Sequence, residues 1–274
     1  MVVSILGCGW YGKALAVDLL KKGVTVKGSA TSAEKLEQLA GKGVLPYLVR
    51  FEGNEQTFAP DFFKCDVLVV SVPPKTKAGE GESFTAKIQQ IIKTCVELQI
   101  QKIIYISSTG VYGDCNCVVD ELSDPNPDTP SGRLLLEAEN LFKNETSFKT
   151  TIVRFGGLIG PGRHPGRFFA GKVNIPNGLA PVNLIHQLDC VAITSAIIER
   201  DAFGHLFNAC SPDHPQKAGF YGNMASKANL AMPEFTNELK NWKIVNSVYL
   251  TELLKYQFIF RQLNDYPFDL NVDS

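Results

Sequence analysis

Residues 2–23 read VVSILGCGWYGKALAVDLLKKG, and this stretch decides the fold. It begins with a short apolar run, Val2–Leu6, that stops abruptly at a glycine, as a buried parallel strand does. Apolar residues then recur at helical spacing through residues 13–22, and Gly23 follows where a helix commonly ends. A strand, a glycine turn and a helix in this order predict the first half of a βαβ unit.

The turn between that strand and helix, residues 7–12, has the pattern G-x-G-x-x-G. In a dinucleotide-binding unit the first glycine permits the tight turn, the second lets a pyrophosphate approach the backbone, and the third lets the helix pack on the strand. Free N–H groups at the helix start then hold the phosphates. The two aromatic residues either cover the pyrophosphate or only pack the helix start. The predicted cofactor contacts in this turn are Gly7, Gly9, Trp10, Tyr11 and Gly12.

Strand and helix patterns alternate over the first 155 residues, which predicts right-handed crossovers and a parallel sheet covered on both faces. We therefore expect an α/β fold, a Rossmann-type doubly wound parallel sheet with a smaller C-terminal α/β lobe. The dinucleotide-binding domain is expected at residues 1–155 plus 184–210. The smaller, substrate-binding lobe is expected at residues 156–183 plus 211–274, where 156–183 is read as a loop with one short helix. Helices are expected at 13–22, 32–40, 83–99, 134–142 and 186–199, and strands at 2–6, 24–28, 44–49, 65–72, 102–107, 151–155, 205–210 and 243–246.

Composition limits the class of protein. The chain has 274 residues, 45% of them hydrophobic and 20% charged, with a formal net charge of −1, which is typical of a globular protein. No Lys/Arg cluster indicates a nucleic-acid partner, and no apolar run reaches transmembrane length or resembles a cleaved leader. We expect a cytoplasmic protein with a small-molecule substrate and no membrane partner, and a homodimer is left open.

The seven cysteines are odd in number and scattered, which favours a reducing compartment over a disulfide framework. Cys115 and Cys117 are the one close pair. As a metal site they lack a second pair at a suitable distance, so we read them as two small loop residues and predict no metal.

The choice of dinucleotide depends on the residues that follow the second strand. NAD-binding units usually place a carboxylate there for the ribose hydroxyls, but this chain has no acid in that region before Glu34. The hydroxyls of Ser29, Thr31 and Ser32 can donate to a 2′-phosphate, and Lys35 would add charge. Ser32 can equally serve as a simple helix N-cap. The pattern favours NADP over NAD.

Residues 105–113 read YISSTGVYG, which resembles the Ser-Ser-x-x-Val-Tyr-Gly segment of the extended short-chain dehydrogenases/reductases, the nucleoside-diphosphate-sugar epimerase group. The G-x-G-x-x-G spacing resembles that of the atypical branch of this family. Further similar segments, which together span nearly the whole chain, lie at residues 119–121, 132–139, 153–163, 183–189, 205–208 and 245–254.

The resemblance implies a site and also exposes a departure from it. Members of the family carry a Tyr-x-x-x-Lys pair, in which the Tyr exchanges a proton with substrate and the Lys lowers its pKa. Here Ser131 and Leu135 stand at those two positions, and neither can replace the original group. Ser108 matches the family's substrate-orienting serine. The remaining residues that the resemblance places beside the cofactor are Val72, Pro73 and Ser107.

Hydride chemistry still needs a proton partner. The candidates are Tyr112, Asp114, His164 and His186, and each has a structural alternative: packing, a solvated loop carboxylate, a loop histidine or a helix-start histidine. We predict Ser108, Tyr112 and His164 as the catalytic residues. Arg163 and Arg167 either hold an anionic group of a substrate or are surface residues.

Two functions follow from this pattern. One is an NAD(P)-binding epimerase/dehydratase-like protein or oxidoreductase that acts, without the usual Tyr/Lys pair, on an unidentified small polar substrate, with a nucleotide sugar left open. The other is a catalytically silent NAD(P)-binding sensor or regulatory protein, which the loss of the Tyr/Lys pair favours.

Overall fold

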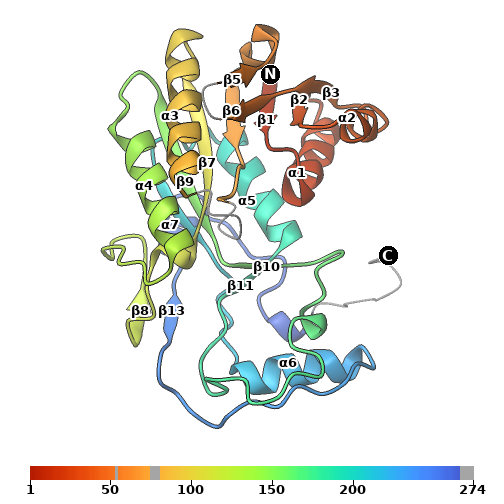
Figure 1. The fold of residues 1–274 in the computed structure, drawn as a ribbon, viewed down its shortest axis with the longest axis vertical. Coiled ribbons are helices and arrows are strands. Elements are labelled where there is room, and N and C mark those ends of the chain that lie inside the picture. The colour runs from red at the N-terminus through yellow and green to blue at the C-terminus, as the bar shows by residue number, and fades with distance from the viewer. Residues whose placement is uncertain (53–54, 75–80, 266–274) are drawn as a thin grey trace.

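The computed structural model describes residues 1–52, 55–74 and 81–265. Its centre is a seven-stranded sheet in which every neighbouring pair is parallel (Figure 1). The strand order reverses between β1 and β6, and ligands of doubly wound sheets bind outside the carboxyl ends of the strands at such a point. In spatial order the strands are β12 (Leu206–Ala209), β9 (Lys149–Phe155), β7 (Lys102–Ser108), β6 (Val67–Val70), β1 (Val2–Leu6), β2 (Thr25–Ala30) and β3 (Leu45–Leu48).

Helices cover both faces of this sheet, as expected for a Rossmann-type fold (Figure 1). One apolar cluster packs α1 (Trp10–Lys21) and α5 (Gln187–Glu199) against the strands, and α2 (Ala33–Ala40) lies beside β2 and β3. A second cluster packs α3 (Gly81–Glu97) and α4 (Pro130–Asn144) on the opposite face. The apolar runs of the central strands β1 and β6 are explained by this two-sided burial, whereas the edge strand β3 is mostly exposed.

A smaller lobe lies beyond the carboxyl ends of the strands (Figure 1). It holds β10 (Gly157–Ile159), which pairs with β11 (Leu184–His186), the short 3-10 helix η4 (Pro165–Arg167) and α6 (Lys217–Lys227). Its own apolar cluster comprises Ile159, Val182, Leu184, Phe220, Tyr221, Met224 and Leu263.

Short elements connect and flank these two parts. Strand β8 (Cys117–Val119) pairs in parallel with β13 (Lys243–Val245), and β4 (Arg50–Glu52) pairs with β5 (Glu55–Thr57). Helix α7 (Val248–Glu252) contributes Leu250 to the cluster of the large sheet, so part of the segment assigned to the smaller lobe from the sequence packs on the sheet instead. The remaining elements are the 3-10 helices η1 (Pro60–Phe63), η3 (Thr109–Val111) and η5 (Leu263–Asp265).

The main differences from the sequence-based elements have local causes. Helix α4 starts at Pro130 rather than at residue 134, because proline suits the first helical position and the Thr129 hydroxyl accepts from the Gly132 N–H at 3.1 Å. The short strands β4, β5, β8, β10 and β11 were not predicted. Each has three residues, which is too short for a periodic pattern. Within the described ranges, no helix is both long and apolar enough to cross a membrane.

Candidate cofactor and substrate site

The three glycines of the turn after β1 have the geometry that a phosphate cradle requires. Gly7 has φ +93°, and a β-carbon there would overlap the carbonyl of Ser71. A β-carbon on Gly9 would meet no atom within 4 Å, so the space above Gly9 is open. A β-carbon on Gly12 would lie 2.9 Å from the Gly7 oxygen and 3.2 Å from Ile5 Cγ2, so α1 packs close against β1. The first glycine turns the chain, the second leaves room, and the third permits packing.

The helix start that follows offers unused donors. The N-cap of α1 is Gly9, and no side chain caps this end of the helix. The first-turn N–H groups of a helix have no intrahelical acceptor, so those of α1 are suited to phosphate oxygens. Ser29 supports the turn from β2: its hydroxyl accepts from the Gly7 N–H at 2.9 Å, and its carbonyl accepts from Cys8 at 3.1 Å. Ser29 is buried and supports the turn. It differs in this from Thr31, which is exposed, and Ser32, which is half-buried.

The two aromatic residues of the turn have different positions. Tyr11 is buried, its hydroxyl donates to Thr194 at 2.6 Å, and its ring packs edge-on against Phe155. The Tyr11 side chain therefore joins α1 to α5, and only its backbone faces the phosphate position. Trp10 instead reaches the smaller lobe: its indole N–H donates to the Pro161 carbonyl at 2.6 Å, and the Arg163 guanidinium lies over its ring at 4.4 Å. Arg167 is exposed in η4.

The adenosine end of the site lies where β2 ends. Thr31 is exposed, and Ser32 occupies the N-cap of α2 but makes no side-chain capping bond. Sequence reasoning missed Arg50, whose Nε and Nη2 donate to the Thr31 carbonyl at 3.2 and 2.5 Å. The ion pairs between described residues do not include Arg50. The parallel pairing of β2 with β3 was the available signal, because it brings the residues after both strands to one edge.

The segment after β6 lies beside the glycine turn. Val72 Cγ2 would be 3.5 Å from a β-carbon on Gly7, and the Ser71 N–H donates to the Leu6 carbonyl at 2.8 Å. Pro73 is exposed at the same edge. Val72 and Pro73 therefore lie next to the glycine turn, and their contact with the cofactor stays a prediction.

Ser107 and Tyr112 belong to a buried polar network rather than to an open pocket. The Ser107 hydroxyl donates to Glu139 at 2.7 Å, and Arg154 binds the same carboxylate through Nε at 2.9 Å and Nη2 at 2.6 Å. Arg154 Nη1 donates to the Tyr112 hydroxyl at 2.6 Å, and that hydroxyl donates to the Asp120 carbonyl at 2.7 Å. Burial, the largest influence, raises the pKa of Tyr112. These partners argue against Tyr112 as the proton donor, and they place Ser107 under the site.

Ser108, the third predicted catalytic residue, is less buried than Tyr112 and His164. It ends β7 half-buried, and its hydroxyl accepts from the Gly110 N–H at 3.1 Å. Helix α4 begins next to it, since a β-carbon on Gly132 would overlap the Gly110 carbonyl. On that helix Ser131 is half-buried, whereas Leu135 is buried in the core. The structure therefore agrees with the departure from the Tyr-x-x-x-Lys pattern: Leu135 packs in the apolar core at the position where the family has a lysine.

The two candidate histidines are both buried and both act as caps. His164 Nδ1 accepts from the Gly166 N–H at 3.0 Å at the start of η4, and His164 is only 1% exposed. His186 Nδ1 accepts from the Leu188 N–H at 3.1 Å at the start of α5, and its ring meets Phe260 at 4.9 Å. Burial lowers the pKa of His186 to about 4. His164, predicted as a catalytic residue, is therefore buried and caps its own loop.

The fourth candidate, Asp114, lies on an exposed loop where its carboxylate accepts from Lys243 at 3.0 Å. One residue further, the structure corrects the sequence reading of the cysteines: Cys115 and Cys117 are joined by a disulfide. Asn116 between them has φ +56°, which turns the chain so that the two Cα atoms are 5.3 Å apart, within disulfide range. Among the described residues no group of three or more His, Cys, Asp or Glu could hold a metal.

A protein-family model described as NAD(P)H-binding matches residues 7–175. Protein YeeZ of Escherichia coli K12 is 37% identical over 244 residues, covering 88% of this chain and 89% of the relative.

Two solved structures show the same fold at low sequence identity. UDP-glucuronic acid 4-epimerase from Bacillus cereus, solved with NAD, has a TM-score of 0.77 at 18% identity, covering 94% of this chain and 91% of that chain. MoeE5, solved with UDP-glucose and NAD, has a TM-score of 0.76 at 18% identity, covering 94% and 93%.

Proposed function

Because the chain belongs to the NAD(P)H-binding family, we propose that it binds NADP in preference to NAD and responds to the bound nucleotide without Tyr/Lys-dependent turnover. The nucleotide lies along the carboxyl edge of the sheet, with its diphosphate on the glycine turn. The proposal rests on the observation that the candidate proton donors already hydrogen-bond to other parts of the protein. Tyr112 and His164 are buried and bonded to their own scaffold, and Ser131 and Leu135 replace the family's pair.

The chemical consequence is a large loss of rate. General acid–base assistance contributes roughly 10²–10⁴ in rate, and a serine hydroxyl is a far weaker acid than a phenol. A protein that keeps the phosphate cradle but lacks this assistance retains affinity for the nucleotide and loses turnover. Such a protein is suited to report the concentration or the redox state of a nicotinamide nucleotide.

The preference for NADP is supported by the residues after β2. The adenosine ribose edge has no carboxylate to repel a 2′-phosphate, and the Arg50 guanidinium is exposed beside Thr31. An arginine at this position accommodates a 2′-phosphate in dinucleotide-binding folds.

A second candidate function has one specific observation in its favour. Ser108 remains half-buried at the end of β7 next to the start of α4, where a substrate oxygen would lie in the related fold. The neighbours solved with UDP-glucose, or named for UDP-sugar epimerisation, suggest a nucleotide sugar as the ligand between the lobes. In this alternative the protein is an oxidoreductase in which a group other than the missing tyrosine exchanges the proton.

The test combines binding with turnover. NADPH fluorescence titration of the full chain is expected to show saturable binding, tighter than for NADH, that Gly9→Ala weakens at least tenfold. Absorbance at 340 nm with NADP and UDP-glucose or UDP-glucuronic acid is expected to show no turnover above the level of the Ser108→Ala variant. Turnover near 10 s⁻¹, a typical enzyme value, that Ser108→Ala abolishes would establish the oxidoreductase instead.

Three further expectations remain proposals. The division into a cofactor domain and a substrate lobe, the homodimer and the cytoplasmic location are checked by limited proteolysis, light scattering and cell fractionation, respectively.

A further inference from the structure

The Cys115–Cys117 disulfide lies on an exposed loop that begins seven residues after Ser108, outside the candidate site. Both cysteines are exposed, whereas Cys8, Cys95, Cys190 and Cys210 are buried and free. The bond closes a ring over a single intervening residue, Asn116. A crosslink over so short a loop removes little entropy from the unfolded chain, so stabilisation of the fold does not explain it.

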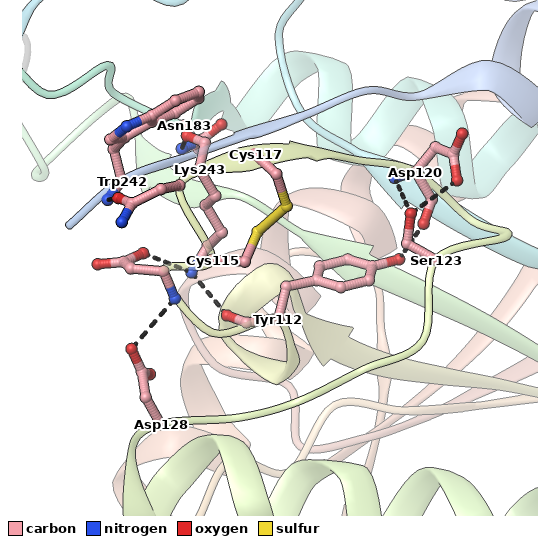
Figure 2. Close-up of a disulfide and its surroundings, with 11 residues drawn as sticks. Tyr112, Cys115, Cys117, Asp120, Ser123, Asp128, Asn183, Trp242 and Lys243 are labelled. Atoms are coloured by element: carbon pink, nitrogen blue, oxygen red, sulfur yellow. Dashed lines mark hydrogen bonds and ion pairs between the residues drawn. A yellow bond between two sulfur atoms is a disulfide. The ribbon is translucent and has the colours of Figure 1, made fainter.

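The disulfide is fixed to one neighbouring segment. The Asn116 N–H donates to the Trp242 carbonyl at 2.8 Å, and the Asn116 side-chain oxygen accepts from the Trp242 N–H at 3.1 Å. Cys117 is the first residue of β8 and pairs with Lys243 of β13. The two sulfurs are therefore held at the surface on a supported loop (Figure 2).

A cation is built into the same place. Lys243 Nζ donates to the Tyr112 carbonyl at 2.6 Å and to Asp114 Oδ1 at 3.0 Å, so the ammonium is held beside the loop that carries Cys115 (Figure 2). The Lys243 side chain is only 14% exposed, which limits screening by solvent. A nearby ammonium favours thiolates and stabilises the sulfur that leaves when a disulfide is cleaved.

From these contacts we propose that Cys115 and Cys117 form a thiol–disulfide exchange site with Lys243 as its positioning cation. The co-reactant is a dithiol, either a protein with a Cys-x-x-Cys pair or a small molecule. A thiolate of the dithiol attacks one sulfur, the Cys115–Cys117 bond breaks, and a mixed disulfide forms while the other cysteine leaves as a thiolate. The second thiolate of the dithiol then displaces the first cysteine, so two electrons and two protons pass to the pair and the dithiol becomes a disulfide.

The exchange is expected to change how the disulfide loop is held against the segment that contains Trp242 and β13. Asn183 donates to the Lys243 carbonyl at 2.9 Å and accepts from the Val245 N–H at 2.9 Å, which ties β13 to the smaller lobe. Reduction releases the loop between Tyr112 and β8. We therefore expect the Asn116–Trp242 hydrogen bonds to open more often in the reduced protein.

The experiment uses the full chain in mixtures of reduced and oxidised dithiothreitol, with alkylation and mass spectrometry of each cysteine. The expected result is reversible loss and gain of two alkyl groups at Cys115 and Cys117, with the four buried thiols unlabelled in the folded protein. Amide hydrogen exchange at Asn116 and Trp242 is expected to be faster in the reduced form. A pair that stays reduced in excess oxidised dithiothreitol, or stays oxidised in excess reduced dithiothreitol, overturns the proposal.

Variants separate the role of the cation from a general effect on folding. Lys243→Met is expected to slow reduction roughly fivefold, Lys243→Arg to retain the rate, and Asp114→Asn to raise it. Lys240→Met is the matched control, because this exposed lysine lies on the same segment and pairs with Glu238. Equal rates for Lys243→Met and Lys240→Met would remove Lys243 from the site and overturn the assignment.

Discussion

Arg154 and Glu139 form a buried ion pair beneath the candidate site, with Nη2 2.6 Å from Oε2 and Nε 2.9 Å from Oε1. The arginine is 1% exposed and the glutamate 0%. The pair joins β9 to α4, and its remaining hydrogen-bonding groups bind Ser107 and Tyr112. Ser107 and Tyr112, which the sequence assigns to the site, are thus part of the buried network beneath it.

This support predicts a large loss of stability when one charge is removed. Glu139→Gln keeps the shape of the side chain but leaves the Arg154 guanidinium uncompensated, and breaking a buried pair in this way costs about 3–5 kcal/mol. Urea unfolding measures the change in the free energy of unfolding. The control is Glu97→Gln at the exposed end of α3, where a surface ion pair is worth less than about 1 kcal/mol. Equal effects of the two substitutions would contradict the structural role.

The glycine turn predicts that a substitution at Gly9 weakens nucleotide binding, whereas a substitution at Gly12 weakens folding. Gly9→Ala places a methyl group where the protein has open space, so we expect normal stability and a loss of nucleotide affinity of at least tenfold. Gly12→Ala forces a methyl group to 2.9 Å from the Gly7 oxygen, so we expect about 1–3 kcal/mol of destabilisation. Nucleotide titration and urea unfolding of both variants check this contrast. Unchanged affinity in Gly9→Ala would show that the diphosphate does not lie on this turn.

Arg50 predicts the discrimination between the two nucleotides. Arg50→Gln removes a charge-assisted contact to a 2′-phosphate, so the Kd for NADPH is expected to rise about tenfold while that for NADH stays constant. The control is Arg200→Gln, an exposed arginine at the C-cap of α5. A parallel loss of both affinities would indicate that Arg50 supports the loop and does not read the phosphate.

His186 predicts a dependence of stability on pH. Its pKa is lowered to about 4 by burial, from 6.5, so the unfolded chain binds the proton more tightly. The stability contributed by the neutral imidazole is present above pH 6.5 and is lost as the pH falls from 6.5 to about 4, by about 2–3 kcal/mol. His186→Asn keeps an N-cap acceptor for Leu188 and removes the titration, so its unfolding free energy should vary less over this range. An unchanged pH slope in this variant would contradict the prediction.

The sheet and the glycine turn could be predicted because their sequences are locally sufficient. Val2–Leu6 and Val67–Val70 are apolar runs with both faces buried, and the spacing of the three glycines fixes the turn. The smaller lobe could not be predicted in the same detail. Its strands β10 and β11 have three residues each and form only because segments 25 or more residues apart pair with each other.

The candidate site shows the same division. Position along the chain correctly brought Ser108 and the glycine turn to one edge, because both follow strands of one parallel sheet. The direction of individual side chains could not be predicted from the sequence. Tyr112 and His164 follow strands that lead to the site, but their side chains hydrogen-bond to buried groups instead. Arg50 and the Cys115–Cys117 bond depend on tertiary neighbours, Thr31 and Trp242, that no local pattern names.

The contact of Trp10 with Pro161 and Arg163 has a kinetic consequence. It joins Trp10, the first residue of α1, to the loop after β10 in the smaller lobe. Because the contact joins the glycine turn to the smaller lobe, we expect separation of the two parts to loosen the turn on which the diphosphate is proposed to lie. A ligand that holds the two parts together is then expected to slow release of the nucleotide.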